Sequence, residues 1–195
     1  MTAAVFERQL VQHCAPAIAG IKPASIITFS RKEGEIGERI REMELAYNRK
    51  FQENDLKLRI LCECPERCLL MVYRPSVLER HVSRPEICGI LQDEGYGTDT
   101  LDEMLDGLAG RIGRSGPCGF PHEIGLFLGY PVEDVVGFME NKGKNCLYSC
   151  YWKVYSDVER AKRWCSRWEK VRDRLMKASD SGMSICEMIR VGAAA

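Results

Sequence analysis

The stretch 119–155 constrains the fold more than any other part of the chain, because it holds two helix signals and a strand signal in close succession. Pro121 suits the first turn of one helix, and a second helix begins after the corner Gly129-Tyr130-Pro131. Residues 148–155 then alternate between two faces, which is the pattern of a β-strand. The stretch therefore predicts two short helices that turn into a strand, within a domain of mixed secondary structure.

Two glycines stand four residues apart in the first of these short helices, at Gly125 and Gly129. A glycine in a helix costs about 1 kcal/mol relative to alanine, so the pair indicates a packing or ligand-binding reason. We expect another backbone segment to approach them closely.

Before this stretch, the chain predicts a short helix over residues 3–13, which places Cys14 at a junction between elements. A strand over 24–30, a charged helix over 31–51 and a hairpin of two strands follow. The second hairpin strand, 68–73, is apolar on both faces and is predicted to be central in a sheet.

The remaining segments are predicted to be helical, and several of their starts carry the Ser/Thr-x-x-Glu pattern of a capping box. These pairs are Ser76 with Glu79, Ser83 with Glu86, Thr100 with Glu103, Ser156 with Glu159, and Ser184 with Glu187. A long helix over 156–178 buries Trp164 and Trp168 on its apolar stripe, and residues 180–195 form a short helix and a flexible tail. We therefore predict a single α+β domain over 1–195, with a small, mainly antiparallel sheet of about four strands covered by helices.

The composition excludes some classes of function. Lys and Arg number 28 against 28 Asp and Glu, so no overall charge drives the protein toward nucleic acid or an anionic membrane. Neither a signal peptide nor an apolar run of membrane-spanning length is present, which predicts a cytoplasmic protein that does not enter a membrane. Without an export signal, the 10 cysteines are interpreted as thiols.

Three motifs together are distinctive: HCAP from His13, FPHEIGLFLGYP from Phe120, and YWKVY from Tyr151. A chain with these motifs resembles an uncharacterised bacterial family, the domain-of-unknown-function family 3793, over nearly its whole length. The resemblance implies a stand-alone cytoplasmic domain and supplies no activity.

Cys14 and His122 are the candidate catalytic residues, with an acid such as Glu123 or Asp134 to orient the imidazole. A cysteine before a proline-containing helical turn can have its thiolate favoured by a helix N-terminus, and Lys22 could add a positive charge. A histidine in a first helical turn stays neutral and can act as a base. The alternative for each is structural, a buried thiol and a histidine that binds a backbone carbonyl.

A pocket lined by Lys22, Phe127, Tyr130, Trp152 and Lys153 would complete such a site. The best-supported function is thus a thiol-dependent enzyme or a small-molecule-binding protein that uses Cys14 and His122. The alternative is a non-catalytic interaction or regulatory protein, whose partner would be another protein.

Two further interpretations are not favoured. Cys62, Cys64 and Cys68 lie beside the predicted hairpin, but their spacing departs from the usual pairs of zinc and iron–sulfur sites. The long helix 156–178 has a local excess of basic residues, which is typical of nucleic-acid binding. Its tryptophans are predicted to be buried, however, so we interpret the basic residues as a solvated helix face.

Overall fold

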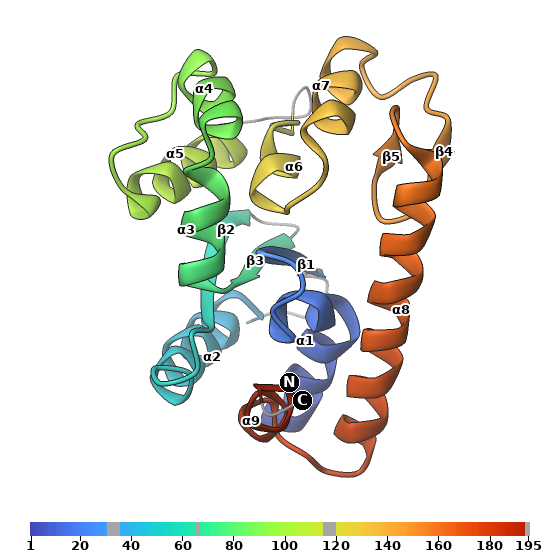
Figure 1. Cartoon of the computed structure of the whole chain (residues 1–195). Helices are drawn as coiled ribbons and strands as arrows, with labels where there is room; N and C mark the ends of the chain where they lie inside the picture. Colours follow the sequence, from blue (N-terminus) through green and yellow to red (C-terminus); the bar gives the residue numbers. More distant parts are fainter. Residues whose placement is uncertain (31–35, 65–66, 115–119, 194–195) are drawn as a thin grey trace.

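The computed structural model confirms the α+β class (Figure 1). It describes residues 1–30, 36–64, 67–114 and 120–193. The helices are α1 (Ala3–Ile18), α2 (Ile36–Lys50), α3 (Pro75–Val82), α4 (Pro85–Asp93), α5 (Leu101–Arg114), α6 (Ile124–Phe127), α7 (Val132–Glu140), α8 (Val158–Asp180) and α9 (Ile185–Ala193). The strands are β1 (Ala24–Ser30), β2 (Lys57–Cys64), β3 (Arg67–Tyr73), β4 (Tyr148–Ser149) and β5 (Lys153–Val154).

The main sheet is antiparallel and has the strand order β1-β3-β2. The predicted hairpin is confirmed as β2 and β3, and its turn at residues 65–66 lies outside the described residues. From Cys68 to Tyr73, β3 is buried on both faces, because its side chains meet helices above and below the sheet. The predicted central position of this strand is therefore also confirmed.

Helices cover the two faces of this sheet in separate groups (Figure 1). Leu70 and Val72 point to one face, where they pack in a core with residues of α1, α2 and α9. Leu69 and Met71 alternate to the other face, where the core is built from α3 to α6. The sheet is thus the middle layer of a three-layer arrangement.

Helix α1 is longer than predicted and ends at Ile18. Pro16 lies inside it, and the helix continues because its last turn is buried and its final carbonyl groups are paired. The Arg74 guanidinium donates to the carbonyl oxygens of Ala17 at 3.2 Å and Ile18 at 2.6 Å. The expectation that Cys14 lies at a junction between elements is therefore wrong, since Cys14 is inside the helix.

Only two of the predicted capping boxes form. Thr100 with Glu103 and Ser184 with Glu187 exchange the expected hydrogen bonds. The other three are wrong: α3 and α4 begin at prolines, with Arg74 and Arg84 as their N-caps, and Asp157 caps α8 in place of Ser156. Proline in the first turn already fixes the backbone angle that starts a helix, so no side-chain cap is needed there.

The prediction that residues 148–155 form a fourth strand of the main sheet is wrong. This segment instead folds back on itself as the two-stranded hairpin β4–β5, in which Tyr148 pairs with Val154 and Ser149 with Lys153. The hairpin lies beside the first turns of α8 (Figure 1). Trp152 and Val154 are buried against α8 in a third, smaller core.

Helix α8 runs along α1 and leads into α9, which packs on the same side of the sheet (Figure 1). The predicted short helix near the C-terminus thus corresponds to α9, and the tail at 194–195 lies outside the described residues. Within the described part of the chain, no helix combines the length and apolar character needed to cross a bilayer.

Candidate functional site

A cavity of about 310 Å³ lies between the α6–α7 corner and the β4–β5 hairpin. It brings together four residues that the sequence predicted for a site: His122, Tyr130, Trp152 and Lys153. Its wall is completed by Phe120, Ile124, Gly125, Asp134, Val135, Phe138, Ser149, Cys150 and Tyr151. Most of these side chains are aromatic or apolar, and the polar groups are few.

Gly125 and Gly129 allow the corner to pack closely, but their nearest neighbours are side chains and not the predicted backbone, and Gly129 follows α6 where it was expected inside the helix. A Cβ atom on Gly129 would lie 2.5 Å from Cδ of Pro23, and Gly129 has a φ of +72°. A Cβ atom on Gly125 would lie 2.8 Å from Cγ2 of Val135, one turn into the next helix. The corner therefore rests directly on the segment between α1 and β1.

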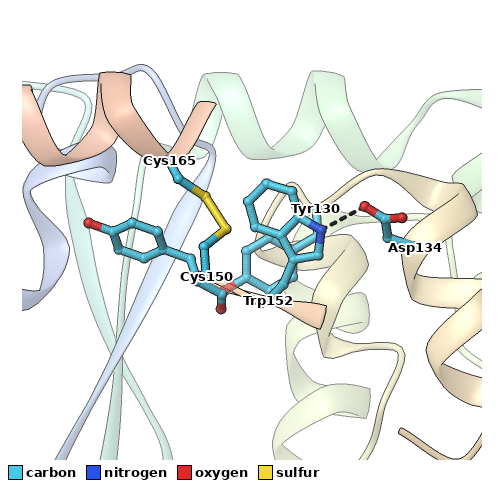
Figure 2. The surroundings of a disulfide bond; sticks show 6 residues. Tyr130, Asp134, Cys150, Trp152 and Cys165 are labelled. Carbon is cyan, nitrogen blue, oxygen red and sulfur yellow. Dashed lines mark hydrogen bonds between the residues drawn. A yellow bond between two sulfur atoms is a disulfide. The ribbon is translucent and has the colours of Figure 1, made fainter. Parts of the chain in front are cut away.

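Stacked aromatic rings form the inner wall of the cavity (Figure 2). Tyr130 and Trp152 stack with their ring centroids 5.1 Å apart, and Trp168 of α8 lies 5.4 Å from Trp152. Beside them a disulfide bond joins Cys150 of the hairpin to Cys165 of α8. The interpretation of all cysteines as thiols is therefore wrong for this pair, which the hairpin fold brings together.

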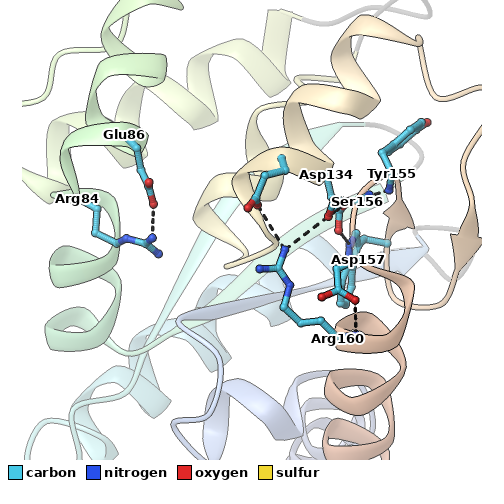
Figure 3. Close-up of polar contacts among 9 residues, drawn as sticks. Arg84, Glu86, Asp134, Tyr155, Ser156, Asp157 and Arg160 are labelled. Carbon is cyan, nitrogen blue, oxygen red and sulfur yellow. Dashed lines mark hydrogen bonds and ion pairs between the residues drawn. The ribbon is translucent and has the colours of Figure 1, made fainter.

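Asp134 fixes the position of the hairpin relative to α7 and α8. Its carboxylate is 1% exposed and accepts a hydrogen bond at 2.7 Å from the indole Nε1 of Trp152. The other carboxylate oxygen accepts from the backbone N–H groups of Tyr155 and Ser156, each at 2.8 Å, and from the Ser156 hydroxyl at 2.7 Å (Figure 3). Four donors thus satisfy one buried charge.

Lys22 lies behind the aromatic wall and is 5% exposed. Its Nζ atom is 4.7 Å from the ring centroid of Tyr130 and 5.0 Å from that of Trp168, within the range of cation–π attraction. Burial lowers the pKa of this amine to about 8. The corner therefore meets the segment between α1 and β1 at Lys22 and Pro23.

Cys14 is fully buried in the core between α1 and the sheet. Burial raises the pKa of its thiol to about 12, and the nearby positive charge of Lys22 lowers it only in part. Because Cys14 is inside α1, the expected help from a helix N-terminus does not apply. At neutral pH this cysteine is a protonated, enclosed thiol.

His122 and Glu123 point to different surroundings. His122 is exposed, packs its ring edge against Phe138 at 4.9 Å, and precedes α6, so it is not in the first turn of a helix as predicted. Glu123 is buried and accepts a hydrogen bond from the Tyr96 hydroxyl at 2.9 Å. It also pairs with Arg111 at 3.3 Å.

Among the described residues, no side-chain hydrogen bond or ion pair joins Cys14, His122 and Glu123 to one another. The catalytic roles given to them therefore stay predictions. Phe127, predicted to bind a ligand, is fully buried against Tyr96 in the core beneath the sheet's second face.

Lys153 stands at the edge of the cavity. Its Nζ donates to the Gly143 carbonyl oxygen at 2.5 Å and lies 5.8 Å from the Phe138 ring centroid. An ammonium group has three donors, so one hydrogen bond to the backbone leaves two for other acceptors.

The three cysteines considered for a metal lie on the hairpin, Cys62 and Cys64 on β2 and Cys68 on β3. Across the described ranges of the chain, no three His, Cys, Asp or Glu side chains gather in a way that could hold a metal ion. Cys64 donates from Sγ to the carbonyl oxygen of Arg67 at 3.4 Å.

Sequence reasoning missed several residues of the cavity wall, above all Phe138, Ser149, Cys150 and Tyr151. Phe138 follows Asp134 by four residues in α7, so helical spacing could have placed both on one face. Helical spacing does not reveal the hairpin residues, because the alternating pattern of 148–155 predicts a single strand.

Comparison with known proteins gives a family and no function. A family model with the description "Protein of unknown function (DUF3793)" matches residues 10–189. No curated protein matches the chain, and no solved structure does.

Proposed function

The chain belongs to the DUF3793 family, whose description states no function, and we propose from the cavity that this domain binds a small molecule. The molecule has a flat, apolar body and a carboxylate group. The observation that carries the proposal is the convergence of aromatic rings and two basic side chains on one cavity of about 310 Å³.

The size and the lining of the cavity support an apolar ligand body. Small-molecule sites typically begin at about 300 Å³ and are lined by apolar and aromatic side chains with a few polar groups. Here Tyr130, Tyr151 and Trp152 come from the corner and the hairpin, and Phe138 comes from α7. Aromatic walls favour a flat ligand that can stack against them or meet their edges.

The polar groups support a carboxylate. Lys153 keeps two donors free for an acceptor, and the exposed imidazole of His122 lies on the same cavity. The negative charge of Asp134 also belongs to the wall, but its carboxylate already accepts hydrogen bonds from four donors of the protein. A ligand carboxylate therefore meets Lys153 and His122 as its available partners.

The proposal gives Cys14 no chemical role. Its thiol is enclosed and its pKa is raised to about 12, so little thiolate exists at neutral pH. Binding by the cavity needs only the side chains that line it.

Ligand-detected NMR with pairs of molecules tests the proposal. The probes are aromatic carboxylates and their neutral amides, such as benzoate with benzamide and indole-3-acetate with indole-3-acetamide. We expect saturation transfer to the carboxylates, and we expect Ser149→Phe to abolish it, because a phenyl ring at this exposed position of the wall fills the cavity mouth. Lys153→Met should weaken the binding of the carboxylates at least tenfold and leave the binding of the amides nearly unchanged.

Ser166→Phe is the matched control, since it places the same ring on the exposed face of α8. Lys144→Met controls for the loss of one exposed lysine near the hairpin. Carboxylate binding that survives Ser149→Phe contradicts the proposed site. So does a Lys153→Met variant in which binding of the carboxylate and binding of the amide weaken equally. Thermal melts of each variant show that the fold is intact.

A further inference from the structure

A row of four basic side chains runs along the outer face of α8. Arg163, Arg167, Lys170 and Arg174 follow one another at intervals of four, three and four residues, so they lie on one side of the helix. All four are exposed, and they line a shallow groove of about 600 Å³. The other residues of the groove are Lys162, Ser166 and Val171. We call these four residues the basic row.

Within the described residues, no carboxylate forms an ion pair with the basic row. The acidic residues of α8 are mostly engaged elsewhere: Glu159 pairs with Lys162, Asp173 with Arg172 and Asp180 with Arg8. Glu169 is exposed as well, but successive helix residues turn by about 100°, which puts it on a different side from the row. Four like charges so close together repel one another, and an anionic partner removes that repulsion.

Trp164 supplies a second kind of contact at one end of the row. The sequence predicted it to be buried together with Trp168, yet only Trp168 is, at 3% exposure, whereas Trp164 is 36% exposed. The prediction is wrong for Trp164 because its ring packs only in part against Trp152 and Trp168 and keeps the rest of its surface open. The Arg160 guanidinium lies 6.0 Å from its ring.

We propose that the outer face of α8 binds the backbone of a single-stranded nucleic acid. Side chains three and four residues apart on a helix are about 5 to 6 Å apart at Cβ, so successive phosphates of an extended strand can each meet one cation of the row. The partly exposed ring of Trp164 then offers a surface on which one base stacks. This inference is independent of the proposed ligand cavity, which lies on the other side of the hairpin and uses none of these residues.

Single strands fit these observations better than other polyanions. An acidic polypeptide would use the cations but not the ring of Trp164. An anionic membrane would need several apolar side chains beside the cations to enter the bilayer interface, whereas the groove offers only Val171 and the row has the single ring of Trp164 at one end. Both partners are therefore outcomes that the test distinguishes.

Fluorescence anisotropy with a labelled twelve-nucleotide oligo-dT and oligo-U tests the proposal on the full chain. Four phosphate contacts predict that the logarithm of the association constant falls with the logarithm of salt concentration with a slope of about −3. Replacing the basic row by glutamine (R163Q/R167Q/K170Q/R174Q) should lower affinity at 50 mM salt at least a hundredfold and flatten the slope.

The matched control removes the same number of exposed positive charges elsewhere, in R39Q/R49Q/R80Q/K144Q. It should bind the oligonucleotides within threefold of the unchanged chain. Trp164→Leu should weaken oligonucleotide binding about tenfold and leave the weak binding of polyglutamate unchanged, because stacking needs the ring.

The proposal is overturned if the oligonucleotides do not bind at 50 mM salt, or if R39Q/R49Q/R80Q/K144Q loses as much oligonucleotide affinity as the basic-row variant. It is also overturned if polyglutamate or vesicles of anionic phospholipid bind with the same affinity as the oligonucleotides. Circular dichroism of all variants shows that α8 is retained. A normal spectrum with normal oligonucleotide affinity in R163Q/R167Q/K170Q/R174Q also contradicts it.

Discussion

Asp134 and Lys22 are both buried charged residues, and each contacts one member of the stacked pair Tyr130 and Trp152: Asp134 binds Trp152, and Lys22 lies over Tyr130. Asp134 has hydrogen-bond donors on both oxygens, whereas Lys22 faces the rings of Tyr130 and Trp168. No carboxylate among the described residues pairs with Lys22. Burial accordingly lowers the pKa of the amine.

The difference shows two ways to keep a charge inside a small domain. A carboxylate that accepts several hydrogen bonds becomes a fixed joint between elements, and removing it leaves buried donors without a partner. An ammonium group held by ring faces has weaker, less directional partners, so it remains close to losing its proton at neutral pH. We expect Asp134 to decide the fold around the cavity and Lys22 to decide how that fold responds to pH.

Removing the Asp134 carboxylate should have the largest effect on stability and tests whether this residue is the joint between the elements. Asp134→Ala removes the acceptor of the buried Trp152 indole N–H, and also that of the Ser156 backbone N–H and hydroxyl, whose hydrogen bonds are partly buried. We expect a loss of about 3 to 5 kcal/mol in the free energy of unfolding, measured by urea denaturation. Glu133→Ala, at the exposed neighbouring position, is the control and should change stability by less than about 0.5 kcal/mol. Equal losses in the two variants would mean that Asp134 is not the joint.

The disulfide tests whether Asp134 holds the hairpin alone. Cys150 and Cys165 are 15 residues apart in sequence, and closing a loop of this length stabilises a domain by about 3 kcal/mol. The double variant C150A/C165A should lose about that amount in urea denaturation without reductant. Dithiothreitol should lower the stability of the unchanged chain similarly and have no effect on the variant. A reductant effect on both proteins contradicts the pairing.

A substitution at Gly129 disturbs the packing next to Lys22 and leaves the hydrogen bonds of Asp134 in place. In Gly129→Ala the new Cβ meets Pro23, which follows Lys22, and the residue must keep a positive φ. We expect a loss of about 2 to 3 kcal/mol in the free energy of unfolding. Gly113→Ala is a control of opposite sign, because no atom of the described residues lies within 4 Å of its Cβ position in α5. It should stabilise the domain by up to about 1 kcal/mol.

The smallest effect concerns pH. The pKa of Lys22 is about 8 in the folded chain, and in the unfolded chain it has its ordinary value of 10.5. Between these two pH values the amine is protonated in the unfolded chain and mostly neutral in the folded chain. Stability from this group therefore rises with pH from about 8 to 10.5, and the penalty for burying the charge is fully present below pH 8. Lys22→Met removes the penalty, so its stability relative to the unchanged chain should fall by on the order of 1 kcal/mol between pH 7 and pH 9.

Urea denaturation of both proteins at pH 7, 8 and 9 measures this difference. Cys14→Ala is the control, because a thiol whose pKa is raised from 9.0 to about 12 contributes only above pH 9, and with the opposite sign. A stability difference between Lys22→Met and the unchanged chain that is constant with pH contradicts the role given to Lys22.

The main sheet could be predicted because its signals are local. Cys68 to Tyr73 is apolar at every position, and only a strand covered on both faces needs that pattern. The end of α1 could not be predicted, since it depends on Arg74, which is distant in sequence and pairs with the last carbonyl groups of the helix. Prolines at 75 and 85 likewise replaced the capping boxes that the serines suggested.

The candidate site was predictable only in part for a similar reason. The motifs at the corner and after it predict that Tyr130, Trp152 and Lys153 line one pocket, and all three line the same cavity. The distance between Cys14 and His122 depends on how whole helices pack, which no local spacing encodes. The disulfide depends on the reversal of the chain at residues 149–153, where an alternating pattern suggested a continuous strand.

All three tryptophans of the chain, Trp152, Trp164 and Trp168, lie in one cluster with ring centroids no more than 6.2 Å apart, and the disulfide adjoins it. Intrinsic fluorescence is therefore emitted from a single end of the molecule. It reports on the hairpin and the start of α8, and it does not observe the three-stranded sheet. An unfolding curve followed by emission and one followed by circular dichroism consequently monitor different parts of the domain, and their coincidence shows whether the two parts unfold as one.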